Sequence, residues 1–429
     1  MKVFLSAIAC HPEHGSEGGL GWKAATALSK KHQVHVLTST SMRTAVERAL
    51  ASGDYPGLTF SYFGKDHPYH QNRRIARLQS WTRYLAWTKQ SLEIARALTA
   101  QQQFDVAHHV TYSSWRVPSP LWRLDLPFVW GPVGGVAEYP KHLLTKLAPH
   151  SALFELARGM SNQYASHSRA LKDCARNSTA VVASNKETFN KLLVLRDRSD
   201  GMNQLFPTFF TDQQIAIFRC DPADKPAADP IRLFAGGNII GSKGLIFALE
   251  ALATLAQQGI KWLLVVGGYG PEIPFLKKKA HALGIDRWID FHMGFSGIEY
   301  SEKLKQSHVF ILPSFRENAG ITMLEAMLAG CVPVIVDASA QADVVSKTCG
   351  FKIPVAKAED IICGLAQAVR LLARETPRRH VMGRNAAAMV EYSFTEDSYT
   401  ASITNIYIDA LARWREAKIT HLHPRGMLT

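Results

Sequence analysis

The sequence lacks the features by which membrane, disulfide-rich and zinc-binding proteins are recognised. No apolar run reaches the length of about 18 residues that a membrane-spanning helix needs. The six cysteines among 429 residues show no Cys-x-x-Cys spacing, so neither a disulfide framework nor a zinc site is expected. The apolar part of the N-terminus, residues 3–9, is at the short limit for a secretory signal, which favours a cytoplasmic protein.

Acidic residues are also in short supply. Lys and Arg number 49 against 36 Asp and Glu, which gives a formal net charge of +13. This charge favours an anionic partner, and the candidates are a nucleotide diphosphate, an anionic membrane surface or a nucleic acid. No nucleic-acid-binding module is recognisable, so no nucleic acid partner is expected.

A dinucleotide cofactor is disfavoured by the first glycine-rich loop. The segment His14-Gly-Ser-Glu-Gly-Gly-Leu-Gly-Trp22 follows an apolar strand and precedes a helix. Its glycines let the backbone approach a ligand closely and offer N–H groups to an anion. However, the segment is not the Gly-x-Gly-x-x-Gly fingerprint, and no acidic residue ends the next strand. An ordinary strand-to-helix turn is the alternative.

Short apolar runs alternate with amphipathic stretches along the chain, which is the pattern of parallel α/β units. A linker rich in Pro, Asp and Ala at residues 221–230 separates two such sets. The expected strands are residues 2–8, 33–38, 58–63, 106–110, 128–131 and 179–183, then 231–235, 262–266, 288–292, 309–312, 332–336 and 350–353. The predicted fold class is therefore α/β, with two Rossmann-like parallel-sheet domains.

The most informative segment follows the apolar strand at residues 309–312. A turn at residues 318–320 precedes helix periodicity, with Glu317 before the helix and Glu325 in its second turn. If the whole span were helical, the two acids would lie about 12 Å apart, roughly the length of an extended nucleotide sugar. Carboxylates accept hydrogen bonds from sugar hydroxyls, and the amides of a helix start bind phosphate. Two solvated acids near a helix are the alternative.

This segment resembles the Glu-x7-Glu signature of the family 4 (GT4) retaining glycosyltransferases, which have the GT-B fold, in which two Rossmann-like domains face a central cleft. The resemblance implies that Glu317 contacts the donor hexose and that Glu325 holds the ribose. The residues that would bind the donor around the helix start are Asn318, Ala319, Gly320, Ile321 and Thr322.

The resemblance also implies a domain organisation. It predicts an N-terminal acceptor-side domain at 1–220, the linker at 221–230, a nucleotide-sugar domain at 231–397 and a C-terminal helix at 398–429 that crosses back to the N-terminal domain. The likeness covers nearly the whole chain and is strongest in residues 231–355.

Two further loops resemble the phosphate-binding loops of the family. Gly18 and Gly19 take the positions of a Gly-Gly pair that touches the donor phosphate, and Lys243 matches a lysine that clamps the diphosphate. A surface lysine is the alternative for Lys243. Asn238 stands where the family has an arginine, and an amide donates hydrogen bonds but brings no charge. Arg316 is a candidate to supply the missing charge.

Other positions match the family's base and hexose contacts. Gly268 lies in a turn that closes the nucleotide pocket, and Met293 and Phe295 would flank the base. His108 matches a histidine whose contact is with the hexose, and His109 is the alternative if the strand is offset by one. Because consecutive strand residues face opposite sides, only one of the two should reach the cleft.

The predicted function is retaining transfer of a hexose from a nucleotide sugar to a glycan or lipid-linked glycan. UDP-glucose or a similar UDP-hexose is the favoured donor, because backbone reading of a uracil edge is common in the family. Residues 105–116 and 130–135 resemble members of the family that build bacterial surface polysaccharides or exopolysaccharides. The predicted catalytic residues are Glu317, Lys243 and one of the two histidines. No Asp-x-Asp triplet, the usual divalent-metal clamp of GT-A enzymes, is present, so no metal or other cofactor is expected.

Three alternatives stay open. A GT-B epimerase would convert a UDP-sugar without an acceptor, a non-catalytic sugar-nucleotide or glycan-binding module would not need Glu317, and a basic adaptor would lose binding with salt. Basic and aromatic side chains alternate in residues 68–89. This pattern favours a peripheral contact with the anionic inner face of the cell membrane. A helix that packs its aromatic stripe on the domain is the alternative for that stretch.

Overall fold

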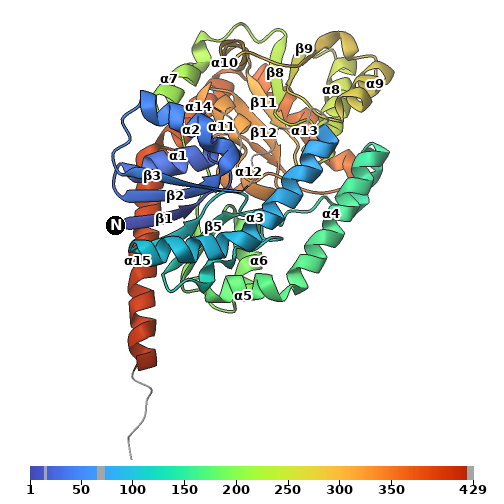
Figure 1. Cartoon of the computed structure of the whole chain (residues 1–429). Helices are drawn as coiled ribbons and strands as arrows, with labels where there is room; N and C mark the ends of the chain where they lie inside the picture. The colour runs from blue at the N-terminus through green and yellow to red at the C-terminus, as the bar shows by residue number, and fades with distance from the viewer. Residues whose placement is uncertain (14–16, 65–72, 423–429) are drawn as a thin grey trace, which may run out of the picture. The chain divides into compact units, whose positions relative to one another are not determined.

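The computed structural model describes residues 1–13, 17–64 and 73–422, and the chain forms two compact units (Figure 1). The first unit contains Met1–Val136, Asn162–Pro207 and Glu396–Thr429, and the second contains Ala137–Ser161 and Thr208–Thr395. The second unit therefore includes two segments, 137–161 and 208–220, that lie before the boundary predicted at residue 220.

A seven-stranded parallel sheet forms the core of the first unit, in the order β3-β2-β1-β4-β5-β6-β7. The strands β4, β5 and β6 are buried on both faces, as expected where helices cover a parallel sheet. Their bounds are β1 Lys2–Ser6, β2 Gln33–Ser39, β3 Leu58–Phe63, β4 Val106–His109, β5 Phe128–Val133, β6 Ala180–Ala183 and β7 Met202–Gln204. Val3 pairs with both Val34 and Val106, so the strand order changes direction between β1 and β4.

Seven helices accompany this sheet among the described residues: α1 Glu17–Ser29, α2 Arg43–Ser52, α3 Arg73–Gln101, α4 Pro149–His167, α5 Arg169–Asn177, α6 Lys186–Arg196 and α15 Glu396–Leu422. Helix α4 begins in the second unit and ends in the first. Helix α1 packs closely on the loop that follows β1, because a Cβ on Gly21 would lie 2.1 Å from the Ala9 carbonyl oxygen. Only glycine fits at that position.

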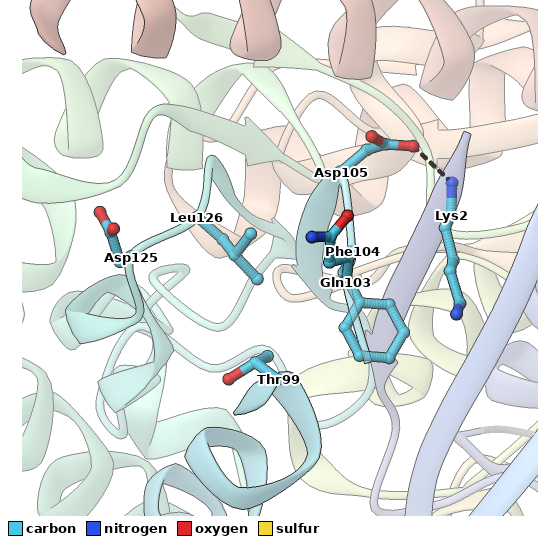
Figure 2. A pocket seen from close by; sticks show the side chains of 7 residues that line it. All are labelled: Lys2, Thr99, Gln103, Phe104, Asp105, Asp125 and Leu126. Carbon is cyan, nitrogen blue, oxygen red and sulfur yellow. Dashed lines mark hydrogen bonds between the residues drawn. The ribbon is translucent and has the colours of Figure 1, made fainter. Parts of the chain in front are cut away.

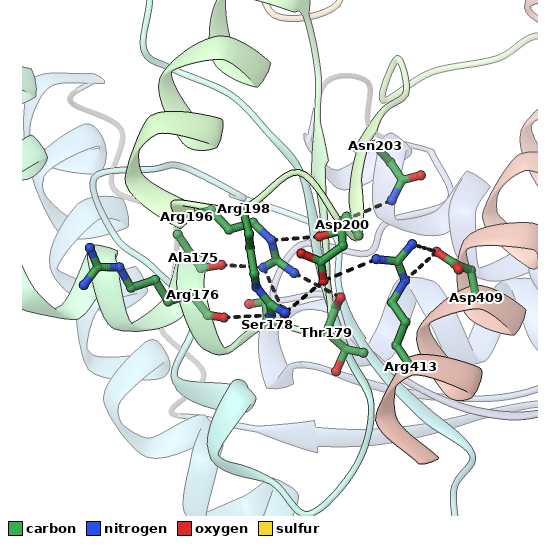
Figure 3. Close-up of polar contacts among 11 residues, drawn as sticks. Ala175, Arg176, Ser178, Thr179, Arg196, Arg198, Asp200, Asn203, Asp409 and Arg413 are labelled. Carbon is green, nitrogen blue, oxygen red and sulfur yellow. Dashed lines mark hydrogen bonds and ion pairs between the residues drawn. The ribbon is translucent and has the colours of Figure 1, made fainter. Parts of the chain in front are cut away.

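The C-terminal helix α15 belongs to the first unit and is held there by polar contacts. Figure 3 shows Arg413 of α15 between Asp409, 2.8 Å away on the same helix, and Asp200, at 3.4 Å. Asp200 also pairs with Arg198 at 2.8 Å, while Arg196 donates to the carbonyls at the end of α5. This network joins α15 to the loop before β7.

The second unit is built on a six-stranded parallel sheet in the order β10-β9-β8-β11-β12-β13. The bounds are β8 Ile231–Gly236, β9 Trp262–Gly267, β10 Ile289–His292, β11 Val309–Leu312, β12 Val332–Val336 and β13 Phe351–Ile353. Its further helices are α7 Asp212–Phe218, α8 Leu245–Gln257, α9 Ile273–Ala282, α10 Gly297–Lys305, α11 Ile321–Leu328, α12 Ser339–Val344, α13 Ala358–Arg374 and α14 Thr376–Ser393.

Residues 137–161 join the second unit through apolar packing. Tyr139, Leu143 and Leu147 are buried in the same hydrophobic core as strands β8, β9 and β11. Burial of these side chains explains why the segment groups with a sheet that lies about 90 residues further along the chain.

The predicted strands occur with small shifts at their ends. The exception is β7, whose sequence Met-Asn-Gln is short and polar and gave no apolar signal. None of the helices that the structure describes combines the length and the hydropathy of a bilayer span.

Candidate functional site

The predicted junction lies at the point where the strand order of the second sheet changes direction. Strands β8 and β11 are neighbours there, although two strands separate them in sequence. Loops at the carboxyl ends of such neighbouring strands form the ligand-binding crevice of open α/β sheets. The relevant loops are 237–244 after β8 and 313–320 after β11.

The two loops are fixed against each other by backbone contacts. Phe315 donates its amide to the Ser242 carbonyl at 2.9 Å. Gly244 has a left-handed φ of 63°, and a Cβ there would lie 2.2 Å from the Pro313 carbonyl oxygen. The glycine after Lys243 is therefore required by geometry, and it fixes where the lysine side chain starts.

Lys243 and Glu317 form an ion pair across this junction. Their side chains are 15% and 10% exposed, so the pair is largely desolvated but still open to solvent. A lysine held in this way can exchange a carboxylate for a phosphate oxygen when an anionic ligand arrives. The structure thus brings together two of the predicted catalytic residues.

The backbone of Glu317 is held by Ser339, a residue that the sequence interpretation missed. The Ser339 hydroxyl accepts from the Glu317 amide at 2.9 Å and donates to the Glu317 carbonyl at 2.6 Å. Ser339 itself has φ 58°, an unfavourable conformation for a residue with a side chain. Such local strain is tolerated where surrounding contacts impose it. No local sequence pattern around Ser339 indicates this contact.

Helix α11 begins directly after the junction. Its N-cap, Gly320, has φ 56°, and the amides of Ile321 and Thr322 have no acceptor within the helix because they lie in its first turn. A Cβ built on Gly237 would lie 3.5 Å from Thr322 Oγ1 and 3.9 Å from Lys243 Nζ. A hydroxyl and an ammonium group therefore surround a space beside a helix N-terminus, which favours an anion.

The second predicted acid, Glu325, has a partner that was not predicted. The hydroxyl of Tyr300 in α10 donates to Glu325 Oε2 at 2.6 Å. The ring of Tyr300 lies 6.3 Å from that of Phe295, which stacks on His292 with a centroid separation of 3.9 Å. The groups at this edge of the sheet therefore follow one another in a fixed order. The order is the rings of His292 and Phe295, the Glu325 carboxylate, the anion site at the start of α11 and the Glu317 carboxylate.

The two residues that were predicted to flank the base lie in different environments. Phe295 stacks on His292, whereas Met293 is 53% exposed. Gly268 has φ 135°, and a Cβ there would lie 2.0 Å from the Gly237 carbonyl oxygen. Gly268 therefore lets the loops after β8 and β9 pack together, which is a structural reason for the glycine.

Arg316 is not placed as a free phosphate ligand. Its guanidinium pairs with Glu155 of α4 at 2.8 Å, and the Glu155 side chain is only 2% exposed. The charge of Arg316 is therefore balanced by a buried carboxylate, and its role as a substitute for the missing arginine stays a prediction. Asn238 is exposed on the loop after β8. Sequence reasoning could not foresee the pairing, because Glu155 lies 161 residues away.

The two histidines of β4 are both buried in the first unit. His108 Nδ1 bonds to the Tyr407 hydroxyl at 2.6 Å and Nε2 to the Gly131 carbonyl at 2.7 Å, so both nitrogens are occupied by the fold. This contradicts His108 as a sugar contact. His109 bonds to Ser6 at 2.9 Å, and no described residue bonds to its Nε2. Burial lowers the pKa of His108 to about 4 and that of His109 to about 3, so both are neutral.

The predicted phosphate contacts of the first unit lie in a helix start. Gly18 and Gly19 are in the first turn of α1, next to Glu17. Glu17 accepts a hydrogen bond from the Tyr112 amide at 2.9 Å, and burial raises its pKa. The Glu17 carboxylate was not predicted as part of this loop. It points to the loop that follows β4.

The basic, aromatic stretch at 68–89 is only partly testable, since residues 68–72 lie outside the described residues. Helix α3 begins at Arg73, and within it Tyr84 and Trp87 are buried at 2% and 5% exposure. These two aromatic side chains pack in the first unit, as the structural alternative expected.

A separate hollow of about 540 Å³ lies at the amino ends of the first sheet (Figure 2). Its lining includes Lys2, whose amide donates to Asp105 at 2.7 Å, and Asp125, which pairs with Lys418 at 2.8 Å. This edge is opposite to the one where α/β folds place their ligands, so the hollow is not part of the candidate site.

Comparison with known proteins agrees with this geometry. Residues 222–389, in the second unit, match the model of the family described as glycosyl transferases group 1. The chain is 27% identical over 202 residues to alpha-D-kanosaminyltransferase of Streptomyces kanamyceticus, which covers 46% of this chain and 51% of that protein. It is 28% identical over 177 residues to the lipopolysaccharide glucosyltransferase WaaG of Escherichia coli (strain K12), which covers 38% and 42%. In these alignments the chain spans about half the length of the curated relatives it matches.

The fold is that of solved glycosyltransferase structures. The structure of Anabaena HepE in complex with UDP and glucose aligns over 94% of this chain and 98% of that chain, with a TM-score of 0.59 at 13% identity. The two parallel sheets with their helices therefore form the GT-B fold, as predicted.

Proposed function

We propose that this protein is a retaining glycosyltransferase that transfers a hexose from a nucleotide sugar to a glycan or lipid-linked glycan. A UDP-hexose such as UDP-glucose is the favoured donor. The observation that supports this proposal most directly is the ion pair of Lys243 and Glu317 beside the start of α11, with Glu325 one turn further on. The group 1 family match over 222–389 and the UDP and glucose bound in HepE support it independently.

The order of groups at the sheet edge suits the parts of a nucleotide sugar. The stacked rings of His292 and Phe295 offer an apolar surface to a base, and Glu325 accepts hydrogen bonds from ribose hydroxyls. The amides of α11 and Lys243 receive the diphosphate, and Glu317 faces the hexose. Lys243 then leaves Glu317 partly for phosphate, which frees carboxylate oxygens to accept from sugar hydroxyls.

In the proposed reaction, the bond between the hexose C1 and the diphosphate oxygen breaks, and an acceptor hydroxyl oxygen bonds to C1 on the same face. The proton of that hydroxyl passes to the departing phosphate. Negative charge grows on the diphosphate as the bond breaks, and Lys243 and the α11 amides stabilise it. This charge compensation is the basis for proposing that transfer needs no metal ion. A lipid-linked acceptor would place the reaction at the cytoplasmic face of the cell membrane, in the synthesis of a surface polysaccharide or exopolysaccharide.

A thermal-shift screen of sugar nucleotides in buffer containing EDTA tests the donor proposal. At 100 times its Kd a ligand stabilises the folded state by about 2.7 kcal/mol, which corresponds to a rise of several degrees in Tm. We expect UDP and UDP-hexoses to produce such a rise, and uridine, which lacks phosphates, to produce little. The proposal would be overturned if none of the nucleotides raised the Tm.

Incubation without an acceptor separates transfer from epimerisation. A transferase leaves a UDP-hexose unchanged apart from slow hydrolysis, whereas an epimerase converts it to its epimer. Appearance of the epimer by NMR of the sugar H1 would contradict the proposed function.

A further inference from the structure

Tyr300 has a more constrained position than its sequence context suggests. Helix α10 begins with reciprocal hydrogen bonds, in which Ser296 Oγ accepts from the Glu299 amide at 3.2 Å and Glu299 Oε2 accepts from the Ser296 amide at 3.0 Å. The Tyr300 ring then packs edge-on against Phe218 at 6.0 Å and Phe234 at 5.8 Å. Both the backbone and the ring are therefore fixed, and the direction of the hydroxyl is fixed with them.

The hydroxyl points at Glu325 and remains a donor. Its oxygen lies 2.6 Å from Glu325 Oε2, a short distance typical of a hydroxyl donating to a carboxylate. Burial, and then the negative charge of Glu325, raise the pKa of Tyr300 well above its ordinary value. The hydroxyl therefore keeps its proton at physiological pH. Tyr300 and Glu325 are both residues of intermediate exposure.

We propose that Tyr300 is a positioning residue, whose hydroxyl holds the Glu325 carboxylate in the orientation that binds the ribose hydroxyls of the donor. This assignment rests on the proposed function. A free glutamate side chain samples several rotamers, and fixing one before binding lowers the entropy lost on binding. A carboxylate accepts several hydrogen bonds at once, so the bond from Tyr300 does not prevent further bonds from ribose.

The consequence is selectivity for ribose. A site built to bond a substrate hydroxyl discriminates against an analogue that lacks it, because the site's polar group then loses its partner. The Tyr300 hydroxyl also bonds to the Thr322 side chain, so its removal acts on both residues. The loss of ribose discrimination should nevertheless exceed any change in the contacts with the phosphates and the base. A purely structural tyrosine would affect both ligands alike.

The test uses Tyr300→Phe, which keeps the ring, and isothermal titration with UDP and with 2′,3′-dideoxy-UDP. We expect the variant to bind UDP roughly three- to tenfold more weakly than the wild type, as for the ordering of one additional side chain on binding. Its affinity for 2′,3′-dideoxy-UDP should fall less, so the Kd for 2′,3′-dideoxy-UDP divided by the Kd for UDP becomes smaller. Glu325→Gln should reduce the preference for UDP over 2′,3′-dideoxy-UDP as well. The double variant Tyr300→Phe, Glu325→Gln should show little further reduction.

Tyr399→Phe is the matched control, because Tyr399 is a buried tyrosine of α15 in the first unit, at 5% exposure. It should leave both affinities unchanged. A Tyr300→Phe variant that keeps the full ribose preference, or that loses affinity for both nucleotides equally, would overturn the assignment alone. If the wild type binds neither UDP nor GDP, the proposed function fails first and the assignment fails with it.

Discussion

The carboxyl edges of the two sheets place polar residues in similar positions but in different environments. At the edge of the second sheet, Lys243 and Glu317 pair with each other and stay 15% and 10% exposed. At the edge of the first sheet, His108 is fully buried and both of its ring nitrogens bond to the first unit's own groups. One edge keeps charges within reach of a ligand, whereas the other uses its polar residue to hold the fold.

The difference shows that a polar residue at a strand end is not sufficient evidence of a site. What separates the two edges is whether the polar atoms have partners that a ligand can replace. The ammonium of Lys243 can exchange one anion for another, but the bond from His108 to the Gly131 carbonyl would leave a buried carbonyl unpaired if it were broken. We therefore expect substitutions at the second edge to affect activity and substitutions at the first to affect stability.

The largest effect is expected for Glu317→Gln. The amide keeps the shape of the side chain but loses the charge that orients Lys243 and the hexose. We expect turnover with a UDP-hexose and acceptor to fall by on the order of 10²–10³, comparable to the loss of one charge-stabilising group in other active sites. Tm should change by no more than a few degrees, as measured by differential scanning fluorimetry.

Glu302→Gln provides the control, since the Glu302 side chain is 53% exposed on α10 and pairs with Lys305 at the surface. Activity of this variant should match the wild type. If Glu317→Gln retained most of its turnover, the second edge would resemble the first, and the protein would fit a binding module better than a transferase.

The second edge was predictable because its signal is local in sequence. A strand, a turn and a helix follow within about 20 residues, so the periodicity placed Glu317 before α11 and Glu325 within it, as observed. Lys243, which follows β8, could be placed by the same reasoning, because neighbouring strands of a parallel sheet bring their carboxyl ends together.

The rest depends on contacts between residues that are distant in sequence. Ser339 holds Glu317 across 22 positions and Tyr300 holds Glu325 across 25, and no local pattern encodes either contact. The burial of His108 and His109 could not be predicted from the sequence either. These histidines differ from exposed residues at strand ends only through the residues that pack on them. The pairing of Arg316 with Glu155 failed to be predicted for the same reason.

A smaller effect, on stability, is expected for Glu155→Gln. The variant leaves Arg316 buried beside a neutral amide, and breaking a buried ion pair by removing one partner costs about 3 kcal/mol or more. Urea unfolding should show this loss. If Arg316 becomes available to phosphate as its partner weakens, affinity for UDP should rise.

Glu250→Gln is a suitable comparison, because Glu250 pairs with Lys146 at 2.8 Å and the two side chains are 23% and 28% exposed, respectively. Its greater exposure should make the loss of stability smaller. Equal losses in the two variants would show that the buried position of Glu155 is not what makes its pairing with Arg316 important.

The smallest effect is expected from acid, and it bears on the first edge. His108 has a folded pKa of about 4 against about 6.5 in the unfolded chain, so at pH 5 the unfolded chain binds the proton and the folded protein does not. Stability from this residue is therefore fully present above pH 6.5 and falls as pH drops towards 4, by roughly 2 kcal/mol at pH 5. The raised pKa of Glu17 acts in the opposite direction, because the folded protein holds that proton more tightly.

Comparison of His108→Gln with the wild type isolates this contribution. Glutamine does not titrate, so the difference in unfolding free energy between pH 7.5 and pH 5, obtained from urea midpoints, should shrink by roughly 2 kcal/mol. His281→Gln, at a side chain that is 83% exposed, should leave the difference unchanged. If His108→Gln left it unchanged as well, His108 would titrate as a solvated imidazole does. The first edge would then be open to ligands in the way that the second edge is.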